Sequence, residues 1–235
     1  MESYTITHRG LKRKENQDRF FIREWNDQTI LLAVADGMGG EAGGGLAAQI
    51  SIETIKDFIP ALATPDTSLK KAFLAAAQRI REEVRKDSRL DGMGTTLTGA
   101  YIINGMTFWT HVGDSRLYLF REGHLTQITE DHTFVNSLVK DGVITREEAE
   151  RHPMQNILLH CVGCEPMEVS SGHFEVFKGD LILLSTDGLH HEVPEKKISS
   201  ILAGETGIKE KFERLIEAAL DAGGRDNITL AGVRI

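Results

Sequence analysis

The chain has 235 residues, of which 40% are hydrophobic and 26% are charged, so it carries enough apolar material for a sizeable core. Its 27 basic and 35 acidic side chains give a formal net charge of 27 − 35 = −8, which argues against a broad surface for nucleic acid or for an anionic membrane. The N-terminal residues lack the apolar segment of a secretion signal, and no apolar run approaches the roughly 20 residues that cross a bilayer. We therefore expect a cytoplasmic protein.

Apolar spacing predicts the elements of the first third of the chain. A first strand is predicted over 3–7, followed by an antiparallel pair over 19–24 and 29–35. The second strand of that pair is apolar on both faces, which is typical of a central strand. Apolar residues three and four apart then predict helices over 43–59 and from 66 to about 88.

The rest of the chain reads mainly as strands joined by hairpins. Consecutive strands are predicted from 95 to 129, with tight turns at Asn104-Gly105 and Glu122-Gly123. The elements expected after them are two short helices over 135–142 and 145–152, a hairpin of 169–177 with 180–185, an amphipathic helix over 208–222 and a final strand over 227–235. This pattern predicts one α+β domain over 1–235, a four-layer α-β-β-α sandwich with two antiparallel sheets flanked by helices.

Aspartates recur where predicted strands begin or end. Asp36, Asp114 and Asp187 follow apolar strands, Asp226 precedes the last strand, and Asp18 lies near the start. Asp-Gly is also an ordinary turn dipeptide, so each aspartate alone has a structural explanation. Their recurrence favours convergence on one cleft, where crowded carboxylates need a cation, and oxygen ligands select a hard ion, Mg²⁺, Mn²⁺ or Ca²⁺.

A second interpretation comes from the glycines after Asp36. Residues 37–42 fit the G-x-G-x-x-A pattern of a dinucleotide-binding turn. Such a unit needs a second parallel strand that ends in an acidic residue about 20 positions on. Asp57 at that distance lies in a predicted helix, and the later strands read as hairpins. A dinucleotide-binding enzyme is therefore only an alternative.

Six short motifs in a fixed order give the chain a family resemblance. It resembles the metal-dependent serine/threonine protein phosphatases (the PPM class, or type 2C) in their compact bacterial form. The motifs are Gly10-Leu11-Lys12-Arg13 with Asn16-Gln17-Asp18, Ala35-Asp36-Gly37-Met38-Gly39-Gly40, Gly94-Thr95-Thr96, Val112-Gly113-Asp114-Ser115-Arg116, Ser185-Thr186-Asp187-Gly188-Leu189 and Gly224-Arg225-Asp226-Asn227-Ile228-Thr229. The resemblance implies hydrolysis of phosphoserine and phosphothreonine by direct attack of a hydroxide that bridges two Mn²⁺ or Mg²⁺ ions.

The resemblance also implies a role for each site residue. Arg13 would bind the substrate phosphate, Asp36 would bridge the two core ions, the Gly37 carbonyl would bind one of them, Asp187 and Asp226 would complete the shell of the other, Asp18 would act through water, and Asp114 would hold a third, weaker ion. Arg13, Asp36 and Asp187 would thus be the catalytic residues.

Two positions depart from the family pattern. Met38 stands where some members carry histidine, which leaves the general acid unassigned. Gln17 stands where many have glutamate, which removes one charge near the ions. Residues 132–163, here named the flap segment, match the family's mobile flap, with a plain surface excursion as the alternative. Cys161 and Cys164 are expected to be two ordinary thiols, with redox regulation as the alternative.

The partners expected from the resemblance are phosphorylated proteins. We expect a bacterial serine/threonine kinase and that kinase's substrates, no nucleic acid, no membrane, and a monomeric chain. The non-enzymatic alternative is a pseudophosphatase that binds phosphoproteins without turnover. Retention of Arg13, Asp36, Asp187 and Asp226 argues against it.

Overall fold

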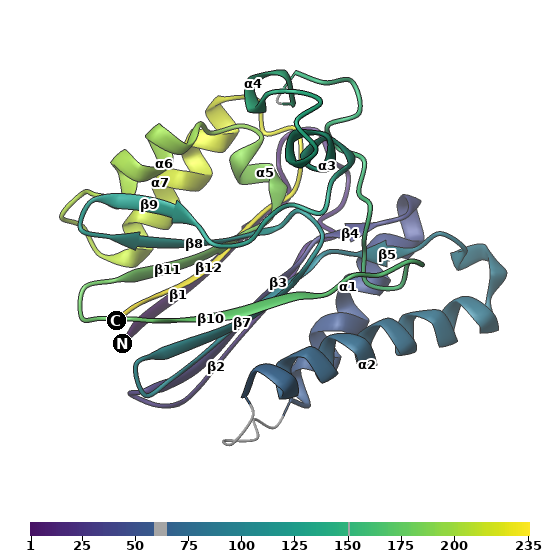
Figure 1. Ribbon diagram of the computed structural model, residues 1–235, viewed down its shortest axis with the longest axis horizontal. Helices are drawn as coiled ribbons and strands as arrows, with labels where there is room; N and C mark the ends of the chain where they lie inside the picture. The colour runs from purple at the N-terminus through teal and green to yellow at the C-terminus, as the bar shows by residue number, and fades with distance from the viewer. Residues whose placement is uncertain (59–64, 150) are drawn as a thin grey trace.

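Two five-stranded antiparallel sheets lie face to face, with helices on both outer faces (Figure 1). The structure is a computed structural model, and it describes residues 1–58, 65–149 and 151–235. The first sheet has the order β1 (Glu2–His8), β12 (Ile228–Arg234), β11 (Leu181–Ser185), β8 (Arg116–Arg121) and β9 (His124–Gln127). The second has the order β10 (Ser170–Glu175), β7 (Met106–Val112), β6 (Leu97–Ile103), β3 (Thr29–Ala35) and β2 (Arg19–Asn26). This confirms the predicted stack of antiparallel sheets.

The helices form the two outer layers. The second sheet is covered by α1 (Gly40–Lys56) and α2 (Pro65–Lys86), and the first by α5 (Asp187–His190), α6 (Glu195–Leu202) and α7 (Ile208–Asp221). The flap segment holds α3 (Phe134–Lys140) and α4 (Arg146–Ala149). A two-stranded ribbon of β4 (Gly37–Met38) and β5 (Gly94–Thr95), with the 3₁₀ turn Ser88–Leu90 before it, completes the described elements.

Strand β3 shows why the sheets stack in this way. Because side chains alternate along a strand, Ile30 and Leu32 point between the two sheets, whereas Leu31 and Ala33 point toward α1 and α2. All seven residues of β3 are buried, as expected of a central strand. Strand β11 alternates in the same way between the inter-sheet core and the core under α7.

The predicted tight turns are confirmed. Asn104 and Gly105 have φ angles of 50° and 79°, and Glu122 and Gly123 have φ angles of 51° and 81°. Two successive residues with positive φ give the turn whose twist matches a two-residue hairpin, and these turns join β6 to β7 and β8 to β9.

The predicted hairpin of 169–177 with 180–185 is wrong. Strand β10 pairs with β7 in the second sheet, whereas β11 lies between β8 and β12 in the first. The chain changes sheets at Gly179, whose φ is 100°, and the Asp180 carboxylate accepts hydrogen bonds from the Phe177 amide and Arg121. A local turn signal indicates a change of direction and does not specify which sheet the next strand joins.

Smaller differences concern helix ends and the cysteines. Helix α1 begins at Gly40 and ends at Lys56, and residue 59, where the sequence predicted its end, lies outside the described residues. Helices α5 and α6 were not predicted, and Asp187-Gly188 begins α5 where a turn was expected. Cys161 and Cys164 form a disulfide, with Cα atoms 5.2 Å apart, and are not the two thiols that were expected.

The pairing of the strands also settles the dinucleotide-binding alternative. Every strand pair that the structure describes is antiparallel, so the parallel βαβ unit that this alternative needs does not occur among the described strands. Strand β1 pairs with β12, which brings the two ends of the chain side by side (Figure 1). In the described part of the chain, no helix has both the length and the apolar character to cross a membrane.

Candidate active site

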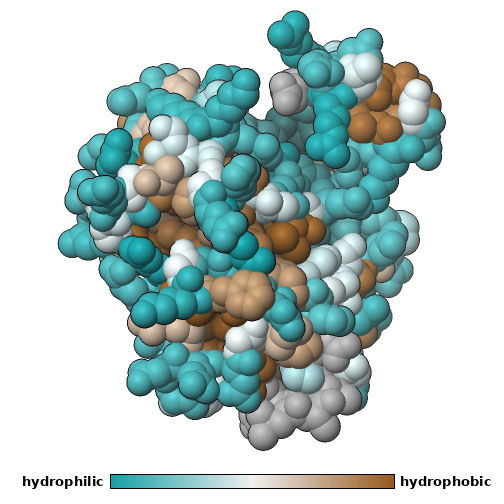
Figure 2. All heavy atoms as spheres, turned by 60° about the vertical axis from the view of Figure 1, so that its left-hand side comes forward, coloured by the Kyte–Doolittle hydropathy of each residue, from teal (hydrophilic) through white to brown (hydrophobic). Residues whose placement is uncertain are grey.

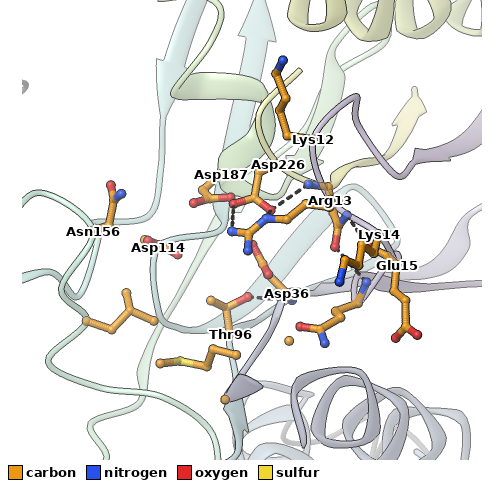
Figure 3. Close-up of a pocket in the computed structure, with 16 residues that line it drawn as sticks. Lys12, Arg13, Lys14, Glu15, Asp36, Thr96, Asp114, Asn156, Asp187 and Asp226 are labelled. Atoms are coloured by element: carbon orange, nitrogen blue, oxygen red, sulfur yellow. Dashed lines mark hydrogen bonds and ion pairs between the residues drawn. The ribbon is translucent and has the colours of Figure 1, made fainter. Parts of the chain in front are cut away.

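The ends of strands from both sheets meet at one cleft of about 720 Å³. Asp36 follows β3, Asp114 follows β7, and Asp187 begins α5 directly after β11 and Thr186. Asp226 arrives from the other side, just before β12. Figure 3 shows these four aspartates around a common space, with Arg13 among them. The structure thus brings together four of the five predicted aspartates with Arg13 and Gly37, which also lines the cleft.

Asp18 lies behind this cleft rather than on its wall. Its side chain is only 3% exposed, and its Oδ2 accepts a hydrogen bond of 2.8 Å from the Thr186 hydroxyl. The Thr186 hydroxyl in turn accepts from the Thr229 amide at 2.9 Å. The other oxygen, Oδ1, is buried and has no hydrogen-bond partner within the described residues. Asp18 is therefore held in one orientation with one oxygen unused.

The backbone of Asp36 is fixed by two threonines. The Asp36 amide donates to the Thr96 hydroxyl at 2.9 Å, and its carbonyl accepts from the Thr95 hydroxyl at 2.7 Å and from the Thr96 amide at 2.9 Å. The next residue must be glycine, because a side chain at Gly37 would collide with the backbone carbonyl of Gly44 in α1. These contacts hold the Asp36 carboxylate at a rigid edge of the core.

Burial and mutual repulsion make the carboxylates costly to ionise together. Burial and the charges of its aspartate neighbours raise the pKa of Asp36 well above its ordinary value. The same causes raise the pKa of Asp114 to about 8 and that of Asp18 to about 7. Burial also raises the pKa of Asp187, but the hydrogen bond from His191 and its charge outweigh this and bring that pKa below its ordinary value.

This donor set suits a hard divalent cation. The candidate ligands are carboxylate oxygens, and a bound cation would relieve the repulsion that raises the pKa values. Asp187 Oδ1, like Asp18 Oδ1, is buried without a hydrogen-bond partner in the described part of the chain. In the arrangement described, no three acidic, histidine or cysteine side chains have the mutual distances of a finished metal site.

Arg13 and Asp226 form an ion pair that involves the carboxylate oxygens of Asp226, which are candidate ligands for an ion. The Nε and Nη2 atoms of Arg13 donate to the two carboxylate oxygens of Asp226 at 2.7 and 2.6 Å (Figure 3). The family resemblance implied separate partners for these residues, a phosphate for Arg13 and an ion for Asp226. The structure pairs them with each other, so each oxygen of Asp226 accepts a hydrogen bond from Arg13.

Asn227 is a site-building residue that sequence reasoning did not single out. Its Oδ1 accepts from the Gln17 amide at 2.8 Å, and its amide nitrogen donates to the carbonyls of Arg9 and Glu15 at 2.8 and 2.9 Å. It thereby ties the loop that carries Arg13 to the start of β12. The available signal was its place directly after Asp226 in the last motif.

The flap segment contributes the outer wall of the cleft. Asn156 and Leu158 line it, opposite the basic residues Lys12 and Lys14. Helices α3 and α4 lie at the top of Figure 1, and in the space-filling view a lobe at the upper right, with a brown hydrophobic patch among teal side chains, is separated from the rest of the molecule by a notch (Figure 2). This part of the flap segment therefore lies beside the cleft.

The sequence matches the protein phosphatase 2C family over residues 8–229. It is 36% identical over 231 residues to a serine/threonine phosphatase stp of Listeria welshimeri, covering 95% of this chain and 92% of that one. It is 38% identical over 224 residues to the serine/threonine protein phosphatase PstP of Mycobacterium tuberculosis, covering 94% of this chain and 42% of that longer one.

Solved structures show the same likeness in three dimensions. The crystal structure of the M. tuberculosis phosphatase PstP/Ppp superposes with a TM-score of 0.92 at 36% identity, covering 100% of this chain and 98% of that one. The catalytic domain of PstP in complex with two manganese ions superposes with a TM-score of 0.87 at 36% identity, covering 98% of this chain and 96% of that one.

Proposed function

The chain belongs to the protein phosphatase 2C family and is a serine/threonine protein phosphatase, and we propose that its five aspartates and Arg13 carry the metal-dependent hydrolysis. The observation that supports this assignment is the convergence of Asp36, Asp114, Asp187 and Asp226 on one cleft, with Asp18 buried behind them. In this proposal Asp36 would hold both core ions, the Gly37 carbonyl would help hold one of them, and Asp187 and Asp226 would help hold the other. Asp18 acts through water, and Asp114 holds a third, weaker ion.

The ions, when bound, would supply a water activated for attack near neutral pH and would neutralise charge on the phosphoryl group. The chain's own residues position the other parts. Arg13, once released from Asp226, can donate two parallel hydrogen bonds to the oxygens of a phosphate, as it now does to a carboxylate. Asn227 and the loop it holds keep Arg13 over the cleft. No side chain is assigned as a covalent nucleophile.

The metal and the partners follow from the same proposal. Mn²⁺ is the ion in a related structure, and Mg²⁺ suits the same oxygen ligands. The substrates are phosphorylated proteins, supplied by a serine/threonine kinase that acts in the cytoplasm, where ATP is available. We propose that the chain works as a monomer, as one catalytic domain with residues 132–163 as its flap, and without a nucleic-acid or membrane partner. Lys12 and Lys14 beside the cleft suit the anionic phosphopeptide.

The test is hydrolysis of a phosphothreonine peptide and of p-nitrophenyl phosphate by the wild-type chain and by Asp187→Asn. We expect the variant to lose most of its activity with Mn²⁺ on both substrates. Asp27→Asn, an exposed aspartate in the turn between β2 and β3, is the matched control and should keep full activity. Full activity of Asp187→Asn would contradict the assignment of this cleft. Binding of phosphopeptide by the wild-type chain without any turnover would instead indicate a pseudophosphatase.

A further inference from the structure

The disulfide between Cys161 and Cys164 lies at the C-terminal root of the flap segment, beside the candidate active site. The residue between them that faces the body, Val162, exchanges two backbone hydrogen bonds with Thr95, of 2.8 and 3.1 Å. The Thr95 hydroxyl holds the carbonyl of Asp36 at 2.7 Å. Thr95 therefore links the turn of residues 161–164, here named the cysteine turn, directly to the backbone of Asp36.

The turn is packed tightly against the same ribbon. A side chain at Gly94 in β5 would collide with the Cys161 sulfur and would lie 3.2 Å from the Cys164 sulfur. Gly163 has a φ of 103°, and a side chain there would lie 2.5 Å from Ile80 in α2. The disulfide thus closes a turn that has no spare room on the side of the protein body.

The same stretch of chain reaches the cleft on its other side. Asn156 and Leu158 line the cleft, and the Leu159 amide donates to the His132 carbonyl at 2.8 Å, which joins the two roots of the flap segment. Only two residues separate Leu158 from Cys161. A change in the cysteine turn is therefore placed to move the part of the flap segment that faces a bound substrate.

The two sulfurs differ in access, as thiol–disulfide exchange requires. Cys161 is 1% exposed, whereas Cys164 is half-buried and can be reached from solvent. Disulfides in cytoplasmic proteins are usually transient and serve in catalysis or redox sensing. Reactivity in such pairs follows from which sulfur an incoming thiolate can attack.

We propose that Cys161 and Cys164 form a redox site, opened by dithiol reductants and closed by disulfide oxidants, that sets how firmly the flap segment is anchored beside the cleft. A thiolate of the reductant attacks the Cys164 sulfur, the S–S electron pair passes to Cys161, and Cys161 takes up a proton. The second thiol of the reductant then attacks its own sulfur in the mixed disulfide. This releases Cys164 as a thiol and leaves the reductant oxidised to its disulfide.

Opening this bond removes the covalent link in the turn and leaves this root of the flap segment held by backbone hydrogen bonds, the two to Thr95 and that of Leu159 with His132 among them. We expect the reduced chain to open locally more often in the flap segment and to bind phosphoprotein substrates more weakly. The effect on substrate binding rests on the function proposed above. The effect on local opening does not.

The test compares the oxidised and the dithiol-reduced chain by thiol titration and by limited trypsin digestion. No thiol should react before reduction and two should react after it, because the chain has only two cysteines. Cleavage after Arg146, an exposed residue of the flap segment, should become about fivefold or more faster on reduction. Cleavage after Lys178, exposed in the turn between β10 and β11, is the internal control and should not change.

Cys164→Ser is the variant of choice, because it leaves the buried Cys161 in place. It should be cut after Arg146 at the reduced rate with or without reductant, and its KM for a phosphothreonine protein should equal that of the reduced wild type. Two thiols that react in the untreated chain, even after treatment with a disulfide oxidant, would overturn the proposal. Equal cleavage after Arg146 in both redox states would overturn it as well. Neither readout needs catalysis, so a chain that fails to hydrolyse phosphopeptides but passes both tests contradicts only the proposed function.

Discussion

Arg13 donates two parallel hydrogen bonds, of 2.7 and 2.6 Å, to the carboxylate of Asp226, a residue 213 positions away in the sequence. The pair lies at the mouth of the cleft and uses both oxygens that Asp226 would offer to an ion. In the proposed mechanism an ion bound by Asp226 would compete with Arg13 for these oxygens, and a guanidinium released from them would be free to bind the substrate phosphate. In that mechanism the pair would link the assembly of the metal site to the recognition of substrate.

The substitution Arg13→Ala separates these two roles. We expect Mn²⁺ to bind the variant at least as tightly as the wild type in calorimetric titration, because Asp226 no longer has a competing partner. We also expect KM for a phosphothreonine peptide to rise by about tenfold or more, since hydrogen bonds to charged groups contribute roughly 1.5–3 kcal/mol. Arg214→Ala, on the exposed side of α7, should change neither quantity. Much weaker binding of Mn²⁺ by Arg13→Ala would contradict the competition.

Divalent ions should stabilise the fold. An ion that binds the folded chain and not the unfolded one adds about 2.7 kcal/mol at a concentration 100 times its Kd, which corresponds to a rise of roughly 5–10 °C in Tm for a chain of this size. We expect this rise on adding Mn²⁺ to chain that has been stripped with EDTA. Calorimetric melting of Asp36→Asn, with and without Mn²⁺, should show a much smaller rise. An equal rise in wild type and variant would mean that the ions bind elsewhere.

His111 should make the fold less stable in mild acid. Burial, together with the charge of His132, lowers the pKa of His111 to about 3 in the folded chain. The hydrogen bond of Nε2 with the Glu130 carbonyl, at 3.2 Å, favours the charged ring, but burial outweighs it and keeps the ring neutral, with Nδ1 at 2.8 Å from the Thr98 hydroxyl. As pH falls below 6.5, the unfolded chain takes up a proton at this position and the folded chain does not, so the free energy of unfolding falls.

At pH 5 the unfavourable protonation of His111 should lower the free energy of unfolding by about 2 kcal/mol. Urea unfolding of wild type and His111→Gln at pH 7 and pH 5, in EDTA, measures it. The variant should lose about 2 kcal/mol less than the wild type between the two pH values. The protonation of carboxylates in the cleft is common to both proteins and cancels in this difference. His124→Gln, exposed on β9, should behave as the wild type, and equal losses in His111→Gln and wild type would refute the assignment.

Gly188 should tolerate no side chain. A side chain there would collide with the carbonyl of Asn227, the residue that ties the Arg13 loop to β12. We expect Gly188→Ala to destabilise the chain by about 1–3 kcal/mol, the usual cost of overpacking, and to lower activity as well. Gly45→Ala in α1 is the control, because its nearest atom is 3.7 Å away. This control should be neutral or stabilising by about 0.5 kcal/mol in urea unfolding. If Gly188→Ala is as stable as the wild type, the loop around Asn227 moves to accept the side chain and the prediction is wrong.

The features that the sequence predicts well are those that depend on near neighbours. The two-sided apolar pattern of 29–35 identifies a central strand, and Asn104-Gly105 identifies a hairpin turn, because both follow from local side-chain alternation and backbone conformation. The separate sheets of β10 and β11 depend on distant pairing partners, which no local pattern names.

The same division applies to the candidate site. Three of the aspartates, Asp36, Asp114 and Asp187, stand out because each follows an apolar strand, and the order of the motifs supports the convergence of all five. The pairing of Arg13 with Asp226 could not be predicted, because it depends on how a loop near the N-terminus lies against the start of β12. The disulfide of Cys161 with Cys164 likewise depends on how Val162 pairs with Thr95 in a distant ribbon.

The release of inorganic phosphate from a phosphothreonine peptide by the EDTA-stripped chain, before and after Mn²⁺ is restored, tests the central claim most directly. The account predicts no release above background in EDTA and a return of activity as Mn²⁺ is titrated back, with little recovery in Asp36→Asn. Full phosphate release by the stripped chain, or full recovery in Asp36→Asn, would contradict it.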